Sequence, residues 1–369
     1  MKKLTVLFLI VILIFATTAC NSTNSDVPNQ NSNGNLPADN GEKETSPDAQ
    51  TPEFISESII IGDGTPWELA GLLTLPANIE GKIPAVVLVH GSGPGNMDGV
   101  PLALSTPNTP FKDIAEYLSL NGIAAIRYDK RTFTHGTKML TELGGSLTVF
   151  EETIEDAILA AELLRADPRI DENRVYILGH SLGGMLAPRI HAMGGNFAGL
   201  ILFAGSPRSL IEILGDQQLL IAKETMEGEA LAEVIALFES GIIAEQTAEI
   251  LALSDDEAKA VIDPSGASLY YYKDLLINPA SNFIKDITVP FLVMHADNDL
   301  QVFTDKDFAM YKELLGDRDN VTFKLYEGLN HFFMPGTVTN IVDILDEYMI
   351  KANVDEQVLR DIVAWIRAN

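Results

Sequence analysis

Residues 179–183, Gly-His-Ser-Leu-Gly, constrain the fold of this chain more than any other stretch. Residues 174–178 before them are β-branched and apolar and predict a buried strand, and residues 184–191 after them predict a helix. A sharp turn between a strand and a helix strains the backbone of its central serine, and glycines are needed where neighbouring chain passes close by. Such a turn presents the Ser181 hydroxyl at the edge of a sheet, where it can act as a nucleophile.

The size and charge of the chain limit what it can be. Its 369 residues exceed one average domain, but a single α/β domain with an insertion accommodates them. The formal net charge of −27 argues against a nucleic-acid partner, because such binding requires a basic face. An acidic surface of this kind favours solubility and does not identify a substrate.

The N-terminus has the pattern of a signal peptide, predicted over residues 1–19. A short basic start precedes the apolar residues 4–15, and small residues follow up to Cys20. The apolar run is too short for a lasting membrane span. Cys20, the only cysteine of the chain, stands at the expected cleavage site and excludes an internal disulfide.

This arrangement resembles a bacterial lipoprotein signal, in which the cysteine is lipidated and becomes the first mature residue. The resemblance implies an extracytoplasmic protein held on the bacterial cell membrane through a lipid on Cys20. The alternative is an ordinary signal and a secreted protein. Residues 21–52 are rich in Asn, Ser, Asp, Pro and Gly, so residues 20–52 are predicted to form a disordered tether ahead of a folded domain over residues 53–369.

Strands and helices alternate along the folded part. Strands are predicted over residues 55–61, 69–75, 85–89, 123–128, 174–178, 199–203, 289–294 and 321–326, and helices over residues 111–120, 150–166, 184–191 and 305–315. This order predicts a mainly parallel sheet with helices on both faces. Residues 209–285 have apolar side chains at helical spacing and predict a helical cap inserted at the carboxyl edge of the sheet, where ligand sites of α/β proteins form.

Four motifs together resemble the α/β-hydrolase family. They are His-Gly-Ser-Gly-Pro at residues 90–94, the turn at residues 179–183, Ala-Asp-Asn-Asp-Leu-Gln-Val at residues 296–302, and Gly-Leu-Asn-His-Phe-Phe at residues 328–333. The resemblance extends from about residue 59 to the C-terminus and is nearest to bacterial carboxylesterases of the dienelactone-hydrolase and serine-aminopeptidase-like group. It implies the α/β-hydrolase fold and a catalytic triad of Ser, Asp and His in this chain order.

The serine needs a base within hydrogen-bond reach, and six histidines compete for that role. His331 follows the last predicted strand, at the edge where Ser181 also emerges, and is the predicted base. The other five are expected elsewhere: His180 pointing away from the site, His90 hydrogen-bonded beneath the glycine-rich loop, His135 in a loop at the substrate rim, His191 along the helix after Ser181, and His295 in the core or at the rim.

An acid must orient the imidazole and offset its transient charge. The family pattern places that acid directly before residues 300–302, which matches Asp299. Asp297 in the same loop is the alternative, and its ordinary role would be turn hydrogen bonding.

The developing oxyanion needs two donors. The fold supplies the backbone N–H of Leu182, and the resemblance implies Ser92 as the second, with Gly91 or Gly93 able to replace it. The spacing of His, Asp and Glu residues predicts no metal site, and no cofactor is implied.

These residues favour a serine hydrolase that cleaves carboxylic esters with small or medium acyl groups through an acyl-enzyme. A serine peptidase of the aminopeptidase-like kind in the same clan and an acyltransferase are the chemical alternatives, and a non-catalytic surface-binding protein is the remaining one. Acyl length and oligomeric state stay open, because neither follows from these motifs.

Overall fold

The computed structural model describes residues 53–104 and 106–369. The predicted signal peptide, the lipid on Cys20 and the predicted tether lie outside the described residues. A central sheet of eight strands runs in the order β1-β2-β4-β3-β5-β6-β7-β8. The strands are β1 (Phe54–Ile61), β2 (Leu69–Pro76), β3 (Ile83–Val89), β4 (Ala124–Tyr128), β5 (Ile170–His180), β6 (Leu200–Phe203), β7 (Phe291–Ala296) and β8 (Val321–Tyr326).

The sheet is mainly parallel, as predicted. β1 pairs with β2 and β2 pairs with β4 in antiparallel fashion, whereas the pairs from β4 through β3 to β8 are all parallel. The fold class predicted from the sequence is therefore confirmed. All the parallel strands end at one edge of the sheet, and the loops that leave this edge carry the candidate residues.

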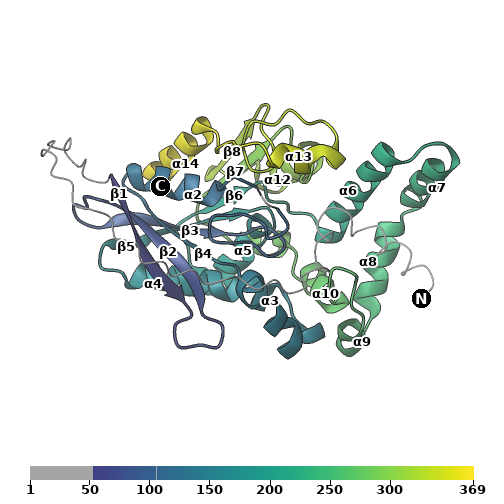
Figure 1. The fold of residues 1–369 in the computed structure, drawn as a ribbon, viewed down its shortest axis with the longest axis horizontal. Helices are drawn as coiled ribbons and strands as arrows, with labels where there is room; N and C mark the ends of the chain where they lie inside the picture. Colours follow the sequence, from purple (N-terminus) through teal and green to yellow (C-terminus); the bar gives the residue numbers. More distant parts are fainter. Residues whose placement is uncertain (1–52, 105) are drawn as a thin grey trace, which may run out of the picture.

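Helices cover both faces of the sheet (Figure 1). They are α2 (Pro110–Leu120), α3 (Arg131–Glu142), α4 (Glu155–Ala166), α5 (Leu182–Ile190), α6 (Leu210–Thr225), α7 (Gly228–Glu239), α8 (Ile242–Ala252), α9 (Asp255–Ala260), α10 (Leu269–Ile277), α11 (Ala280–Ile284), α12 (Ala309–Leu315), α13 (Ile344–Tyr348) and α14 (Glu356–Ala368). Short π-helical turns, η3 (Phe150–Ile154) and η5 (Thr304–Phe308), run directly into α4 and α12.

The continuous apolar run of β3 follows from burial on both faces. Val87 and Val89 pack in one core with the buried residues of α4 and α5. Val86 and Leu88 point the other way, into a second core shared with α2 and α14. Alternate side chains of one strand thus reach opposite helix layers, so neither face of the strand can be polar.

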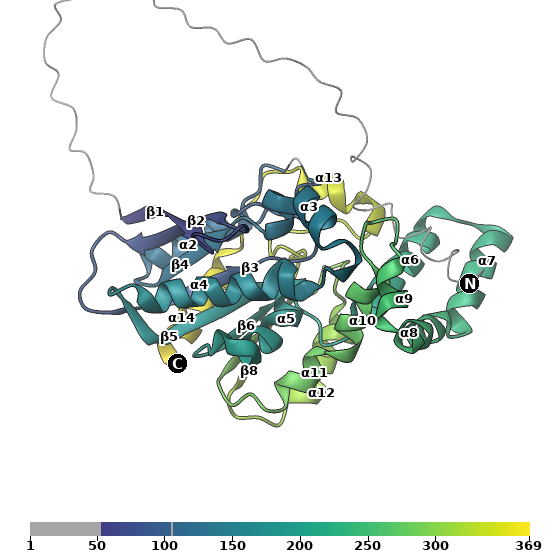
Figure 2. The ribbon, with the colours of Figure 1, turned by 90° about the horizontal axis from the view of Figure 1, so that it is seen from below.

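The connection between β6 and β7 contains the helices α6 to α11, joined by short non-helical segments. Both views show α6 to α10 gathered at one end of the molecule, beyond the sheet (Figures 1 and 2). A small core of its own, built around Ile250, Leu269 and Tyr272, holds this helical insertion together. Within residues 53–104 and 106–369, no helix is both long and apolar enough to cross a membrane.

Candidate active site

The backbone of Ser181 is strained, as the turn between β5 and α5 requires. Its φ is 54° and its ψ is −117°, a conformation that costs a non-glycine residue about 1–3 kcal/mol. Two flanking glycines make the turn possible. A Cβ on Gly179 would lie 2.2 Å from the carbonyl oxygen of Gly183, and one on Gly183 would lie 2.5 Å from that of Val89. The crowded turn leaves Ser181 half-buried at the end of β5.

A pocket opens at Ser181. Its polar lining includes Ser92, Ser181, Gln301 and His331. None of the helices α6 to α11 contributes a residue to the lining of this pocket. Its apolar wall is formed by Leu104, Phe111, Phe332, Ile344, Leu345 and Tyr348.

His331 and Asp299 form a buried pair beside the pocket. His331 Nδ1 lies 2.6 Å from Asp299 Oδ2, and each residue is only 4% exposed. The other Asp299 oxygen accepts hydrogen bonds from the backbone N–H groups of Gln301 at 2.8 Å and Val302 at 2.9 Å. Both carboxylate oxygens are therefore engaged, and the one that faces His331 favours a proton on Nδ1, which leaves Nε2 free to accept a proton.

Ser181 and His331 line the same pocket, but no hydrogen bond joins the Ser181 hydroxyl to His331 among the described residues. Such contacts are often long before substrate binds and tighten in the reacting complex. The arrangement therefore brings the predicted nucleophile and the predicted base to one cavity without a direct hydrogen bond between them in the described structure.

Asp297 has a different environment from Asp299. It is exposed, and its Oδ1 accepts a hydrogen bond of 2.7 Å from the backbone N–H of Gly328. This is the loop hydrogen bonding expected of the alternative acid. Of the two carboxylates, only Asp299 contacts His331 in the described structure.

The glycine-rich loop after β3 passes close to Ser181. A Cβ on Gly91 would lie 3.0 Å from Ser181 Cβ, which is why this position needs glycine. The next residue, Ser92, lines the pocket, and its N–H donates to no protein acceptor within the described residues. Leu182 is the first residue of α5, where N–H groups lack a partner inside the helix. Two backbone donors thus flank Ser181.

His180 and His90 lie beside the site, but neither takes the place of His331 as the predicted base. His180 Nε2 donates to the carbonyl oxygen of His331 at 3.0 Å, and its ring stacks on Phe332. His90 Nε2 donates to the carbonyl oxygen of Asn96 at 2.9 Å, as expected beneath the loop. Burial lowers the pKa of His180 well below its usual range and that of His90 to about 4, so both rings are neutral at pH 7.

The sequence predicts a loop at His135, and this is wrong. His135 lies within α3, at a kink where its φ is −123°, and its Nε2 contacts the carbonyl oxygen of Glu68 at 2.8 Å. Tertiary contacts impose this helix on a Thr- and Gly-containing segment of weak helix propensity. His191 Nδ1 accepts from the N–H of Phe197, and His295 is a fully buried core residue.

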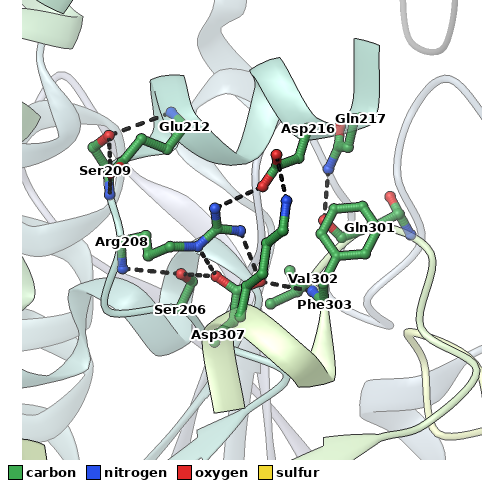
Figure 3. A network of polar contacts seen from close by, with 12 residues as sticks. Ser206, Arg208, Ser209, Glu212, Asp216, Gln217, Gln301, Val302, Phe303 and Asp307 are labelled. Carbon is green, nitrogen blue, oxygen red and sulfur yellow. Dashed lines mark hydrogen bonds and ion pairs between the residues drawn. The ribbon is translucent and has the colours of Figure 1, made fainter. Parts of the chain in front are cut away.

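A buried polar network holds the loop that carries Asp299 (Figure 3). At its centre the carboxylate of Asp307, wholly buried, accepts hydrogen bonds from Ser206 Oγ at 2.5 Å and Arg208 Nε at 2.7 Å. The backbone N–H of Phe303 donates to the same carboxylate at 2.6 Å. The chain after β6 is thereby fastened to the chain after β7.

A second link in Figure 3 reaches the pocket itself. Gln217 of α6 donates through Nε2 to the carbonyl oxygen of Gln301 at 2.8 Å. The Gln301 side chain in turn donates to the hydroxyl of Tyr348 at 2.7 Å, and Gln301 and Tyr348 both line the pocket. The first helix of the insertion therefore braces the loop between Asp299 and Asp307.

Several pocket residues were not predicted from the sequence. The wall from α13 (Ile344–Tyr348) lies outside every motif, and no local pattern marks it as part of a pocket. Lys130 does not line the pocket, but a charged residue two positions after the buried strand β4 could have drawn attention to it. In the described part of the chain, no group of three or more His, Cys, Asp or Glu side chains is arranged to hold a metal ion.

The sheet order, the strained serine between β5 and α5 and the His331–Asp299 pair are those of an α/β hydrolase. A model of the Alpha/beta hydrolase family matches residues 86–337, and the chain belongs to that family. Esterase EstD of Thermotoga maritima is 35% identical to this chain over 324 residues, which cover 87% of this chain and 69% of that protein.

Solved structures resemble the chain at lower sequence identity. An esterase from Pyrobaculum calidifontis has a TM-score of 0.50 and 16% identity and covers 86% of each chain. Est1E from Butyrivibrio proteoclasticus has a TM-score of 0.49 and 16% identity, over 83% of this chain and 98% of that one. At this identity the Pyrobaculum structure supports the fold alone.

Proposed function

We propose that this protein is a serine hydrolase that cleaves carboxylic esters of small or medium acyl groups, with Ser181, Asp299 and His331 as its catalytic triad. The observation that carries the proposal is the 2.6 Å contact between His331 Nδ1 and Asp299 Oδ2 at a pocket that Ser181 also lines. The 35% identity to Esterase EstD supports ester hydrolysis as the reaction.

In the acylation step, Ser181 Oγ attacks the ester carbonyl carbon while its proton passes to His331 Nε2. The carbonyl π electrons move onto oxygen, and the N–H groups of Ser92 and Leu182 stabilise the oxyanion. The loss of one such donor typically costs about 3 kcal/mol of barrier. The tetrahedral intermediate then expels the alcohol oxygen, which takes the proton from His331, and an acyl-Ser181 ester remains.

Deacylation repeats the sequence with water. His331 removes one proton from water as its oxygen attacks the acyl carbon, and collapse of the second intermediate returns that proton to Ser181. The carboxylic acid leaves, and the enzyme is restored. Throughout, the carboxylate of Asp299 offsets the positive charge on the imidazolium.

The pocket wall supports a substrate with an apolar group. Leu104, Phe111, Ile344 and Leu345 lie on it beside the polar edge that Ser181 and His331 form. An acyl or alcohol chain packed there would lose water from both surfaces, at about 25 cal/mol per Å² of apolar area.

The proposal is tested with Ser181→Ala on p-nitrophenyl acetate and butyrate, alongside aminoacyl p-nitroanilides. We expect hydrolysis of the esters by the wild type, with the variant at least about 10⁴-fold slower, because the covalent route is removed. Circular dichroism verifies that the variant is folded. Near-wild-type ester turnover in folded Ser181→Ala would sink the proposal, and turnover of anilides in preference to esters would replace it with a peptidase.

We also propose that Cys20 carries a lipid and holds the enzyme on the outer side of a bacterial cell membrane. What supports this is the basic and apolar start followed by the only cysteine of the chain. One acyl chain gives only marginal membrane binding, so stable anchoring requires a second signal, such as a further acyl chain.

The anchor is tested by expressing the full chain and Cys20→Ala in a bacterium fed with an alkyne fatty acid. The wild type is expected to take up the label and sediment with membranes, and the variant to lose both properties. Equal labelling of the two proteins, or an unlabelled wild type in the medium, contradicts lipidation at Cys20.

A further inference from the structure

A lysine side chain is buried directly behind the glycine-rich loop. Lys130 follows β4, is only 2% exposed, and donates through Nζ to the carbonyl oxygen of Gly91 at 2.8 Å. Its backbone N–H donates to the carbonyl oxygen of Gly95 at 3.0 Å. One residue therefore binds both ends of the loop that passes close to Ser181.

The contact with Gly91 has a consequence for the next N–H. A trans peptide unit is planar, and its C=O and N–H point in opposite directions. None of the described peptide bonds is cis. When Lys130 holds the Gly91 oxygen on one side, the N–H of Ser92 must point to the other side, away from the lysine. That N–H has no protein acceptor within the described residues, and Ser92 lines the pocket.

We propose that Lys130 is a positioning residue that orients the Gly91–Ser92 peptide so that the N–H of Ser92 faces the developing oxyanion. This rests on the proposed ester hydrolysis at Ser181 and adds a residue that touches neither substrate nor nucleophile. The ammonium acts through the peptide. Without it, the peptide could rotate and turn its carbonyl oxygen, rather than its N–H, toward the negative charge.

Lys130 is also linked to the helical insertion, through Glu152. Its Nζ forms an ion pair of 2.7 Å with Glu152 Oε1, and the other oxygen of Glu152 accepts a hydrogen bond of 2.6 Å from the hydroxyl of Tyr271 on α10. Burial, and then the Glu152 carboxylate, raise the pKa of Tyr271 well above its usual range, so the phenol keeps its proton. The chain Tyr271–Glu152–Lys130–Gly91 thus joins the insertion to the oxyanion side of the site, although the insertion does not line the pocket.

Stability alone is a poor explanation for this buried pair. Removing two charges from water costs several kcal/mol per ion, and apolar residues of similar volume are often neutral or more stabilising. Here Lys130 places a donor on one carbonyl group, which fixes an orientation that an apolar side chain cannot fix. A role in orientation predicts a loss of catalysis rather than a loss of folding.

The test replaces the ion pair as a unit. Lys130→Met/Glu152→Met removes both charges and leaves no buried ion unpaired. The matched control is Arg189→Met/Asp274→Leu, because this pair also joins α10 to the main fold, at 2.6 Å and with side chains 7% and 14% exposed, without contacting the glycine-rich loop. Both proteins are compared with the wild type on p-nitrophenyl butyrate, with folding followed by circular dichroism.

The affinity for an alkyl trifluoromethyl ketone is a second measurement, and it should not change if Lys130 has only a structural role. Ser181 Oγ adds to the ketone carbon, the hydroxyl proton passes to His331, and the carbonyl π pair becomes an oxyanion. We expect Lys130→Met/Glu152→Met to lower kcat about 100-fold with KM nearly unchanged, and to weaken ketone binding in parallel, since an oxyanion donor is lost. The control pair should change neither kcat nor ketone affinity by more than a few-fold.

Wild-type kcat and ketone affinity in folded Lys130→Met/Glu152→Met would overturn the inference, as would equal losses in the control pair. If the double variant does not fold, Tyr271→Phe decides the question, with kcat expected to fall roughly tenfold for one lost hydrogen bond to a charged group. Unchanged kcat and ketone affinity in that variant then overturn it. Ser181→Ala is measured in the same assays. If the hydrolysis by the wild type does not depend on Ser181, the proposed function itself is refuted. If it does depend on Ser181 and the double variant is unaffected, only the role of Lys130 is refuted.

Discussion

At the scale of single residues, the two aspartates of one loop differ by what each carboxylate contacts. Asp299 is buried and divides its oxygens between His331 and two backbone N–H groups. Asp297 is exposed and caps the N–H of Gly328. Although the two aspartates are only two residues apart, Asp299 can orient the proposed base, whereas Asp297 stabilises a turn.

This difference predicts the behaviour of two matched variants. Asp299→Asn should lower kcat on p-nitrophenyl butyrate by about 10⁴, because the amide no longer holds His331 in the tautomer that leaves Nε2 free as base. Asp297→Asn keeps an oxygen that can accept from Gly328, so its kcat should stay within a few-fold of the wild type. Turnover is measured on the same ester, with circular dichroism as the folding check.

The assignment fails if the two variants exchange places. An inactive Asp297→Asn beside an active Asp299→Asn would mean that the loop rearranges on substrate binding and presents the other carboxylate.

At the scale of elements, the loops around Ser181 depend on polar contacts from outside the sheet. Asp307 and Gln217 brace the loop after β7, and Lys130 braces the loop after β3. In both cases the contact leads to the helical insertion, through α6 or through α10. The insertion therefore touches the proposed site by its hydrogen bonds rather than by covering the described pocket.

Some of the helices and strands in the structure were predicted from the sequence, and others were not. β8 lies over the residues predicted for it, and α2 begins one residue before its predicted start, because strong apolar periodicity marks both. α14 was not predicted, although Val358, Ile362 and Ile366 recur at helical spacing and could have marked it. α3 was missed for a physical reason, since its helix depends on distant partners such as Glu68 and Asp156.

At the scale of the whole molecule, buried neutral histidines link stability to pH. Burial lowers the pKa of His90 and of His295 to about 4, from an ordinary value near 6.5. Between these values the unfolded chain binds protons that the folded chain does not, so the free energy of unfolding falls as the pH falls from about 6.5 to 4. Each imidazole should remove about 2 kcal/mol between pH 7 and pH 5.

We predict that His295→Gln has a shallower pH dependence of stability than the wild type. His295 Nε2 donates to the carbonyl oxygen of Gly205 at 2.9 Å, and the glutamine amide can replace that donor without titrating. Urea unfolding at pH 7 and pH 5 measures the difference, and the variant should lose about 2 kcal/mol less than the wild type over this interval. Equal losses in the two proteins would show that His295 titrates normally in the folded state.

The sequence by itself determined the sheet and the turn at Ser181. Continuous apolar strands must be buried on both faces, and a Gly-x-Ser-x-Gly stretch between a strand and a helix allows few backbone geometries. Local periodicity carries that information. The motif at residues 296–302 also indicated Asp299 rather than Asp297, and the structure adds the contact of Asp299 with His331, 32 positions along the chain. Only the tertiary structure decided that His135 is helical and that Lys130 reaches Gly91, because these contacts join residues 67 and 39 positions apart. Distances across the fold follow from how the layers pack, and no local pattern in the chain encodes them.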